Sequence, residues 1–179
     1  MHKSHVYLMG YRGSGKSTVG RLLAAKLKWS AVDSDDVIEH NCGKSIREIF
    51  AAEGESGFRD LEQSALQQIT SIDRPSIVSL GGGAILREAN RLLICTSGNV
   101  IWLRATPETL YARIAGDGTT AQRRPNLSRA GGLAEVVDIL ARREPIYQQM
   151  ADFIVDTDAM DADTICDRVL CWLETQRTA

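Results

Sequence analysis

The sequence has little that could form a disulfide framework or a metal site. Its four cysteines show no C-x-x-C spacing; they are Cys42, Cys95, Cys166 and Cys171. No secretory signal pattern accompanies them, so we expect reduced thiols in a cytoplasmic protein. The three histidines also lack the spacing of metal ligands, so we expect no structural zinc site.

The sequence also lacks a long apolar run and an excess of charge of one sign. No apolar run approaches the ~20 residues that a membrane-spanning helix needs. The net charge is −2, so no basic field attracts nucleic acid or an anionic membrane. A chain of 179 residues, 44% of them hydrophobic, suits one globular domain with its own core. We therefore expect a single domain over residues 1–179, without nucleic-acid or membrane partners.

A phosphate-binding loop is present in full between Gly10 and Thr18. It reads GYRGSGKST, which matches G-x-x-x-x-G-K-[ST] at every fixed position. An apolar run precedes it and a helical stripe follows it, which is the strand–loop–helix context that the motif requires. Backbone N–H groups of such a loop surround phosphate oxygens at a helix N-terminus. Lys16 can reach the β- and γ-phosphates, and Ser17 can ligate Mg²⁺. The loop predicts a nucleoside triphosphate site rather than a glycine turn that merely precedes a helix.

Strand and helix patterns alternate along the chain. Five short runs rich in Val and Ile predict strands at 6–9, 30–33, 76–80, 99–103 and 153–156. Among the helical segments between them, Ser45-x-x-Glu48 is a capping box, and Thr106-Pro107 is typical of a helix start. This alternation favours an α/β fold, with a five-stranded parallel sheet between two layers of helices. The phosphate loop then lies at the carboxyl end of a strand.

One segment, about 116–132, shows neither helical nor strand periodicity. It contains Arg123-Arg124-Pro125 and closes on two glycines. A loop of this length inside a domain is usually functional or disordered. Beside a phosphate loop, its arginines favour a mobile lid that closes over the phosphates. A solvated surface insertion is the alternative.

Acidic residues follow the second predicted strand. Residues i and i+2 of a strand point to one side, so we expect Asp33 and Asp35 to share a face at the ligand-binding edge of the sheet. One carboxylate could hold the water shell of Mg²⁺ and the other could accept a proton from an attacking hydroxyl. The alternative is an acidic helix N-terminus in which Asp36 alone is the cap.

Three glycines, residues 81–83, end the third predicted strand. They would let the backbone approach a ligand closely and donate N–H groups, unless they form a plain tight turn. Arg59 and Arg143 are candidates to clamp the carboxylate of an anionic acceptor. Spacing alone does not separate these two from solvated surface arginines.

In these motifs and their order, the chain resembles the shikimate kinase family over nearly its whole length. The series consists of the phosphate loop, Asp33-Ser34-Asp35, Gly54-Glu55-x-x-Phe58-Arg59-x-x-Glu62 and Ser79-Leu80-Gly81-Gly82-Gly83, followed by Arg124-Pro125 and Arg143-Glu144-Pro145-Ile146-Tyr147. The phosphate loop alone is shared by many kinases, whereas the full series is specific. The resemblance implies a three-layer α/β/α P-loop kinase fold with a mobile lid. It also implies Mg²⁺-dependent transfer of the γ-phosphate of ATP to the 3-hydroxyl of shikimate, in aromatic amino acid biosynthesis by way of chorismate.

The resemblance further implies roles for single residues. The nucleotide phosphates would be held by Gly13, Ser14, Gly15, Lys16, Ser17 and Thr18, with Arg124 contacting ATP from the lid. Shikimate would be bound by Asp35, Arg59, Gly82 and Arg143. One Mg²⁺ would be held by Ser17, with Asp33 near its water shell. Catalysis would depend on Lys16, Asp35 and Arg124, and the protein would be a monomer as family members generally are.

Other nucleotide-binding classes fit less well. A gluconate kinase has a similar hydroxy-acid acceptor and stays open as an alternative. A GTPase switch expects an Asn-Lys-x-Asp motif, and the sequence has no Asn-Lys pair. A dinucleotide-binding Rossmann site fails because Thr18 stands where G-x-G-x-x-G needs glycine. A catalytically silent nucleotide-binding module is disfavoured by the presence of Lys16 and the acidic pair.

Overall fold

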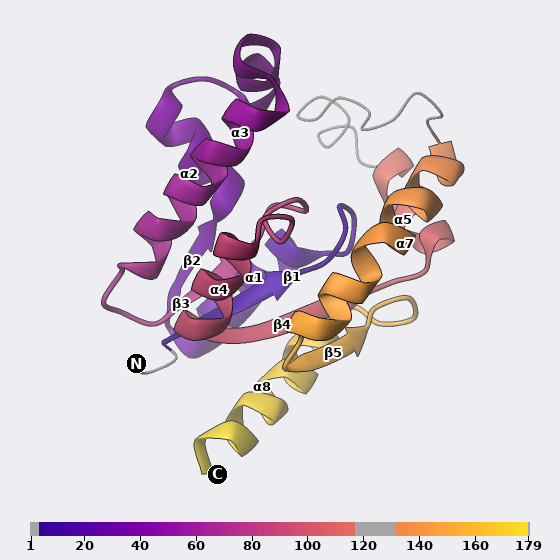
Figure 1. Ribbon diagram of the computed structural model, residues 1–179. Helices are drawn as coiled ribbons and strands as arrows, with labels where there is room; N and C mark the ends of the chain where they lie inside the picture. The colour runs from indigo at the N-terminus through magenta and orange to yellow at the C-terminus, as the bar shows by residue number, and fades with distance from the viewer. Residues whose placement is uncertain (1–3, 117–131, 179) are drawn as a thin grey trace.

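A five-stranded parallel sheet forms the centre of the molecule (Figure 1). The computed structural model describes residues 4–116 and 132–178. The strands are β1 (His5–Met9), β2 (Ser30–Asp33), β3 (Ser76–Ser79), β4 (Gly98–Arg104) and β5 (Phe153–Asp156). Their order is β2-β3-β1-β4-β5, and every pairing is parallel. The five predicted strands are confirmed, each end within one residue.

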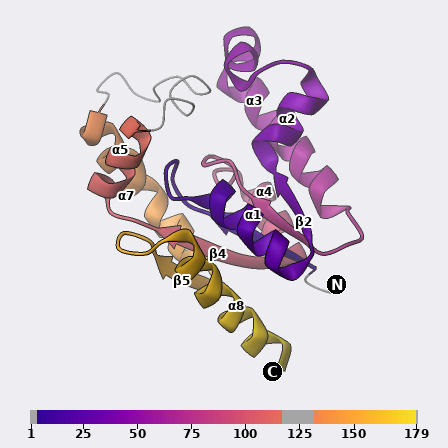
Figure 2. The ribbon, with the colours of Figure 1, turned by 180° about the vertical axis from the view of Figure 1, so that it is seen from behind.

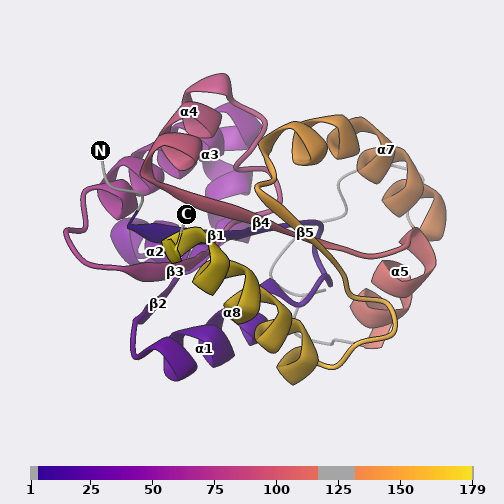
Figure 3. The ribbon, with the colours of Figure 1, turned by 90° about the horizontal axis from the view of Figure 1, so that it is seen from below.

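Helices cover both faces of this sheet. They are α1 (Lys16–Leu27), α2 (Ser34–Cys42), α3 (Ile46–Thr70), α4 (Glu88–Ser97), α5 (Pro107–Gly116), α7 (Gly132–Met150) and α8 (Ala162–Thr178). Helices α1 and α8 lie on one face, while α3, α4 and α7 lie on the other (Figures 2 and 3). The predicted three-layer α/β/α fold is confirmed. None of the helices in the described ranges is long and apolar enough to cross a membrane.

The central strand β1 is buried on both faces, which is why residues 6–9 form an apolar run. Val6 and Leu8 pack with α1 and α8, while Tyr7 and Met9 pack with the core beneath α3, α4 and α7. Both neighbours of β1 are hydrogen-bonded to it along its length. The phosphate loop therefore begins from the middle strand of the sheet, which is paired on both edges.

Local signals set the helix boundaries as expected. Ser45 and Glu48 form the predicted capping box at the start of α3, and α5 begins at Pro107 behind Thr106. Helix α3 is kinked at Gly54, whose φ of 67° is non-helical. The predicted lid at 116–132, with Arg123 and Arg124, lies outside the described residues except for its two ends.

Candidate functional site

The phosphate loop joins β1 to α1 in a turn that requires glycine. Gly13 and Gly15 have φ values of 81° and 92°, in the left-handed region where a side chain is strained. Gly15 is also the residue before the first turn of α1, so the N–H groups of that turn face the loop. The Lys16 Nζ donates to the carbonyl oxygens of Gly10 at 2.9 Å and Tyr11 at 2.8 Å. The Lys16 ammonium group is thus hydrogen-bonded to carbonyl oxygens of its own loop, and phosphate oxygens of a nucleotide could replace these acceptors.

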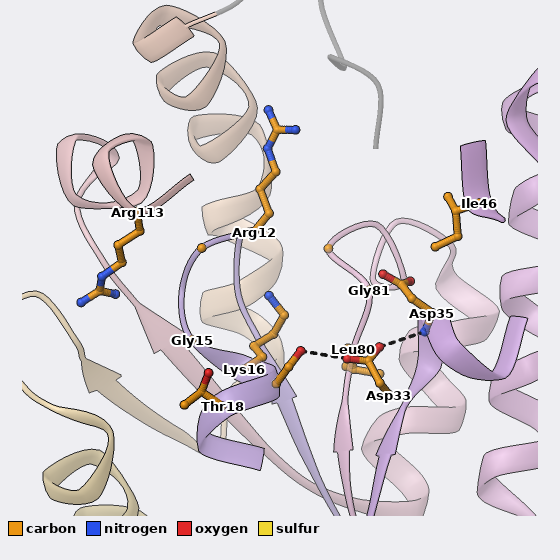
Figure 4. A pocket seen from close by; sticks show the side chains of 13 residues that line it. Arg12, Gly15, Lys16, Thr18, Asp33, Asp35, Ile46, Leu80, Gly81 and Arg113 are labelled. Carbon is orange, nitrogen blue, oxygen red and sulfur yellow. Dashed lines mark hydrogen bonds between the residues drawn. The ribbon is translucent and has the colours of Figure 1, made fainter. Parts of the chain in front are cut away.

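A cavity of about 330 Å³ opens beside this loop (Figure 4). It is lined by Arg12, Gly13, Gly15, Lys16, Ser17, Thr18, Asp33, Asp35, Ile46, Leu80, Gly81, Gly82 and Arg113. Of the residues predicted to hold the nucleotide phosphates, all but Ser14 and the undescribed Arg124 line the cavity. The Ser14 side chain is instead buried within the loop. The phosphate loop and the carboxyl ends of β2 and β3 therefore enclose one space.

Asp33 connects the two sides of the cavity. The Ser17 Oγ donates to Asp33 Oδ2 at 2.9 Å, and the Asp35 N–H donates to Asp33 Oδ1 at 3.0 Å. Burial raises the pKa of the Asp33 carboxyl, and the neighbouring Asp35 charge adds to the rise. A bound cation beside Asp33 would relieve this repulsion.

The prediction that Asp33 and Asp35 share one face of a strand is wrong. Strand β2 ends at Asp33, and Asp35 lies in the first turn of α2. Asp33 caps α2 through the Asp35 N–H, so the alternative with Asp36 as the cap is wrong as well. Both predicted carboxylates nevertheless line the cavity, because the strand end and the helix start lie at the same edge of the sheet.

The three glycines after β3 form a turn in which two backbone groups already make hydrogen bonds within the protein. The Gly81 N–H donates to Ser34 Oγ at 2.8 Å, so it is not directed at a ligand as we expected. The Gly82 carbonyl accepts from Arg143 Nη1 at 2.7 Å. A Cβ added at Gly83 would come within 2.2 Å of Arg59 Nη1. The glycines therefore allow two arginines to approach the turn closely.

Arg59 and Arg143 are buried and do not line the cavity; they lie against the glycine turn. The Arg59 Nη1 donates to both carboxylate oxygens of Glu62, at 3.0 and 2.9 Å. Its guanidinium also lies 5.2 Å from the Phe58 ring centroid. Arg143 lies 5.9 Å from the centroid of the Tyr11 ring. Neither is a solvated surface arginine, and both converge on one turn from helices far apart in sequence.

Sequence reasoning missed two arginines of the cavity wall. Arg12 occupies a variable position of the phosphate-loop pattern, and its Nη2 pairs with Glu135 Oε1 at 3.0 Å. Arg113, near the end of α5, donates to Thr157 Oγ1 at 3.1 Å and to the Thr157 carbonyl at 2.6 Å. The arginine inside the loop could have been noticed from the sequence. Arg113 is brought to the site only by tertiary packing.

Ser17 and Asp33 offer oxygen atoms that suit Mg²⁺. Among the described residues, no group of three or more His, Cys, Asp or Glu side chains is placed to hold a metal ion. Mg²⁺ is usually held by one or two protein oxygens together with water and substrate phosphates. The adjacent hydroxyl and carboxylate beside the phosphate loop fit that pattern.

Comparisons with known proteins agree on one family. A family model described as shikimate kinase matches residues 12–174. The chain is 52% identical to a shikimate kinase of Rhodopirellula baltica over 93% of this chain and 88% of that protein. It is 40% identical to one of Symbiobacterium thermophilum, over 93% and 94% of the two chains. Among solved structures, shikimate kinase from Acinetobacter baumannii in complex with shikimate superposes with a TM-score of 0.89 at 33% identity, covering 98% and 96% of the two chains.

Proposed function

The chain belongs to the shikimate kinase family, and we propose that it transfers the γ-phosphoryl group of ATP to the 3-hydroxyl of shikimate. The products are shikimate 3-phosphate and ADP, in the route through chorismate to aromatic amino acids. One observation carries the proposal: a single cavity has the phosphate loop in one wall and Asp35 with the glycine turn in the other. This arrangement supports a nucleotide site and an acceptor site within reach of each other.

The donor side consists of the phosphate loop and its neighbours. The residues proposed to hold the ATP phosphates are Gly13, Ser14, Gly15, Lys16, Ser17 and Thr18. We propose one Mg²⁺ on Ser17, with Asp33 acting through a bound water. When bound, Mg²⁺ neutralises charge on the β- and γ-phosphates. Arg113 is a further candidate for contact with the nucleotide, since its guanidinium is held at the cavity wall by Thr157.

The acceptor side is assigned to Asp35, Gly82 and the two buried arginines. Asp35 orients the 3-hydroxyl and accepts its proton as that oxygen bonds to the γ-phosphorus and the bond to ADP breaks. Arg59 and Arg143 lie against the glycine turn, two of whose residues line the cavity, and there they are proposed to bind the shikimate carboxylate as guanidinium forks. Burial keeps both side chains in one conformation, which lowers the entropic cost of that clamp.

Four further assignments complete the proposal. Arg124, outside the described residues, is proposed to contact ATP and stabilise the transferred phosphoryl group. The chain is proposed to be one P-loop kinase domain that acts as a monomer in the cytoplasm. Light scattering on the purified protein measures the oligomeric state directly.

A coupled assay of ADP release tests the function. We expect turnover with ATP, Mg²⁺ and shikimate, and none when gluconate replaces shikimate. Arg59→Ala should weaken shikimate binding and leave ATP binding unchanged in separate titrations. Turnover with gluconate, or equal loss of both ligands in the variant, contradicts the assignment.

A further inference from the structure

An ion pair between the phosphate loop and α7 has no part in the mechanism above. Arg12 Nη2 lies 3.0 Å from Glu135 Oε1, although the two residues are 123 positions apart in the chain. The side chain of Glu135 is only 1% exposed and that of Arg12 only 14%. A buried pair of this kind is weak evidence for stability, because desolvation of both charges opposes their attraction. Its position therefore points to a role other than stability.

The Arg12 side chain forms part of the cavity wall. In Figure 4 it extends above Lys16 while Asp35 faces the gap from the α2 side. The Arg12 Nε is buried without a hydrogen-bond partner among residues 4–116 and 132–178. A buried donor of this kind costs free energy unless an oxygen satisfies it.

The aromatic ring of Tyr11 contributes to this arrangement. The Arg12 guanidinium lies 5.8 Å from the Tyr11 ring centroid, and Arg143 lies 5.9 Å from the same centroid. Tyr11 is itself 1% exposed, so the ring is a fixed support. Glu135 and Tyr11 together restrict where the Arg12 guanidinium can lie.

We propose that Glu135 is a positioning residue that holds the Arg12 guanidinium where it contacts the phosphoryl group in transfer. This inference rests on the proposed function, because it assumes that a phosphoryl group crosses this cavity. The transferred group spreads negative charge over three oxygens, and fixed cations stabilise that charge more than they stabilise the bound substrates. Lys16 serves this purpose from the floor of the loop and Arg12 from its wall.

A double-mutant cycle tests the proposal in the full-length protein. Arg12→Met should lower kcat about 100-fold, the scale of removing one preorganised electrostatic contact. Glu135→Gln, which keeps the side-chain shape, should lower kcat about 10-fold because Arg12 is then poorly placed. KM for shikimate should change less than about 3-fold in both variants. If Glu135 acts through Arg12, Glu135→Gln should have no further effect on kcat in the Arg12→Met background.

Asp138→Asn on the same helix is the matched control. Asp138 pairs with Arg142 at 2.7 Å, but both side chains are more than half exposed, so kcat should stay at the wild-type value. Thermal unfolding checks that each variant is folded. If Glu135→Gln is not, Glu135→Asp withdraws the carboxylate by one methylene and takes its place.

The outcomes separate the two proposals. Additive losses of kcat would mean that Glu135 does not act through Arg12. A large rise in KM for shikimate at unchanged kcat would place Arg12 on the acceptor carboxylate. Either result overturns the inference and leaves the proposed function intact. Failure of the wild-type protein to release ADP with shikimate contradicts the proposed function itself.

Discussion

Replacing Gly83 with alanine should weaken shikimate binding and leave ATP binding unchanged. A Cβ at this position would lie 2.2 Å from Arg59 Nη1 and 2.6 Å from its Cζ, whereas ordinary contacts begin at 3.4 Å. Gly83 is not among the glycines with positive φ, so alanine is compatible with the backbone and the effect is purely steric. The Arg59 guanidinium must retreat by about 1.2 Å to reach an ordinary contact.

A retreat of this size moves the Arg59 guanidinium away from the glycine turn, where the carboxylate site is proposed. Each hydrogen bond to a charged group contributes roughly 1.5–3 kcal/mol. Loss of about 3 kcal/mol corresponds to roughly a 100-fold rise in the Kd for shikimate, since each tenfold change is about 1.4 kcal/mol. The Kd for ATP should be unchanged, because the described contacts of the Arg59 guanidinium are with the glycine turn and with its own helix α3, not with the phosphate loop.

Isothermal titration of Gly83→Ala with each ligand separately measures both constants. Gly83→Ala combined with Arg59→Ala supplies the control, because the alanine should have no further effect once the guanidinium is gone. Unchanged shikimate affinity in Gly83→Ala, or equal weakening of both ligands, would refute the reasoning.

Three further predictions concern ionisable groups. Asp33→Asn should lower kcat about 10- to 100-fold, the usual range for residues that act on a metal through water. The same variant should raise the unfolding temperature of the unliganded protein. Burial raises the pKa of Asp33, which means that its charged form is unfavourable in the folded protein, whereas Asn is uncharged and can still cap α2. An unchanged or lower unfolding temperature would contradict this. His5 is buried in β1 and burial lowers its pKa below 6.5, so the unfolded chain binds more protons in acid and the unfolding temperature should fall as the pH drops below about 6.5. That dependence should weaken in His5→Leu, and a pH profile parallel to wild type would exclude the histidine as its source. Burial raises the pKa of Cys166 to about 11, so a thiol reagent followed by mass spectrometry should modify exposed Cys171 well before Cys166.

The fold could be predicted from the sequence because its strongest signals are local. Strand β1 is apolar from Val6 to Met9 since both its faces are buried, and backbone geometry requires glycine at Gly13 and Gly15 of the phosphate loop. The capping box at Ser45 needs only residues three positions apart. Such signals do not depend on the rest of the chain.

Other features depended on contacts that spacing does not encode. The strand-face argument for Asp35 failed because the cap at Asp33 begins α2 directly at the end of β2. Arg12 owes its place to a partner 123 residues away and Arg113 to one 44 residues away. The burial of Arg59 against Gly83 likewise follows from the packing of α3 on the turn after β3. Tertiary packing, and not local sequence pattern, determines which arginines are buried.

The helices α2 and α3 have a small core of their own. Ile38, Ile46, Ile49, Phe58 and Ala65 form a cluster separate from the two clusters on the faces of the sheet. A unit with its own core can open and close as a cooperative body while the central strand stays protected from exchange with solvent. Amide hydrogens of α2 and the first half of α3 should therefore exchange sooner than those of β1. Because this cluster is separate from the cores beneath the sheet, substitutions within it should change α2 and α3 without disturbing the phosphate loop.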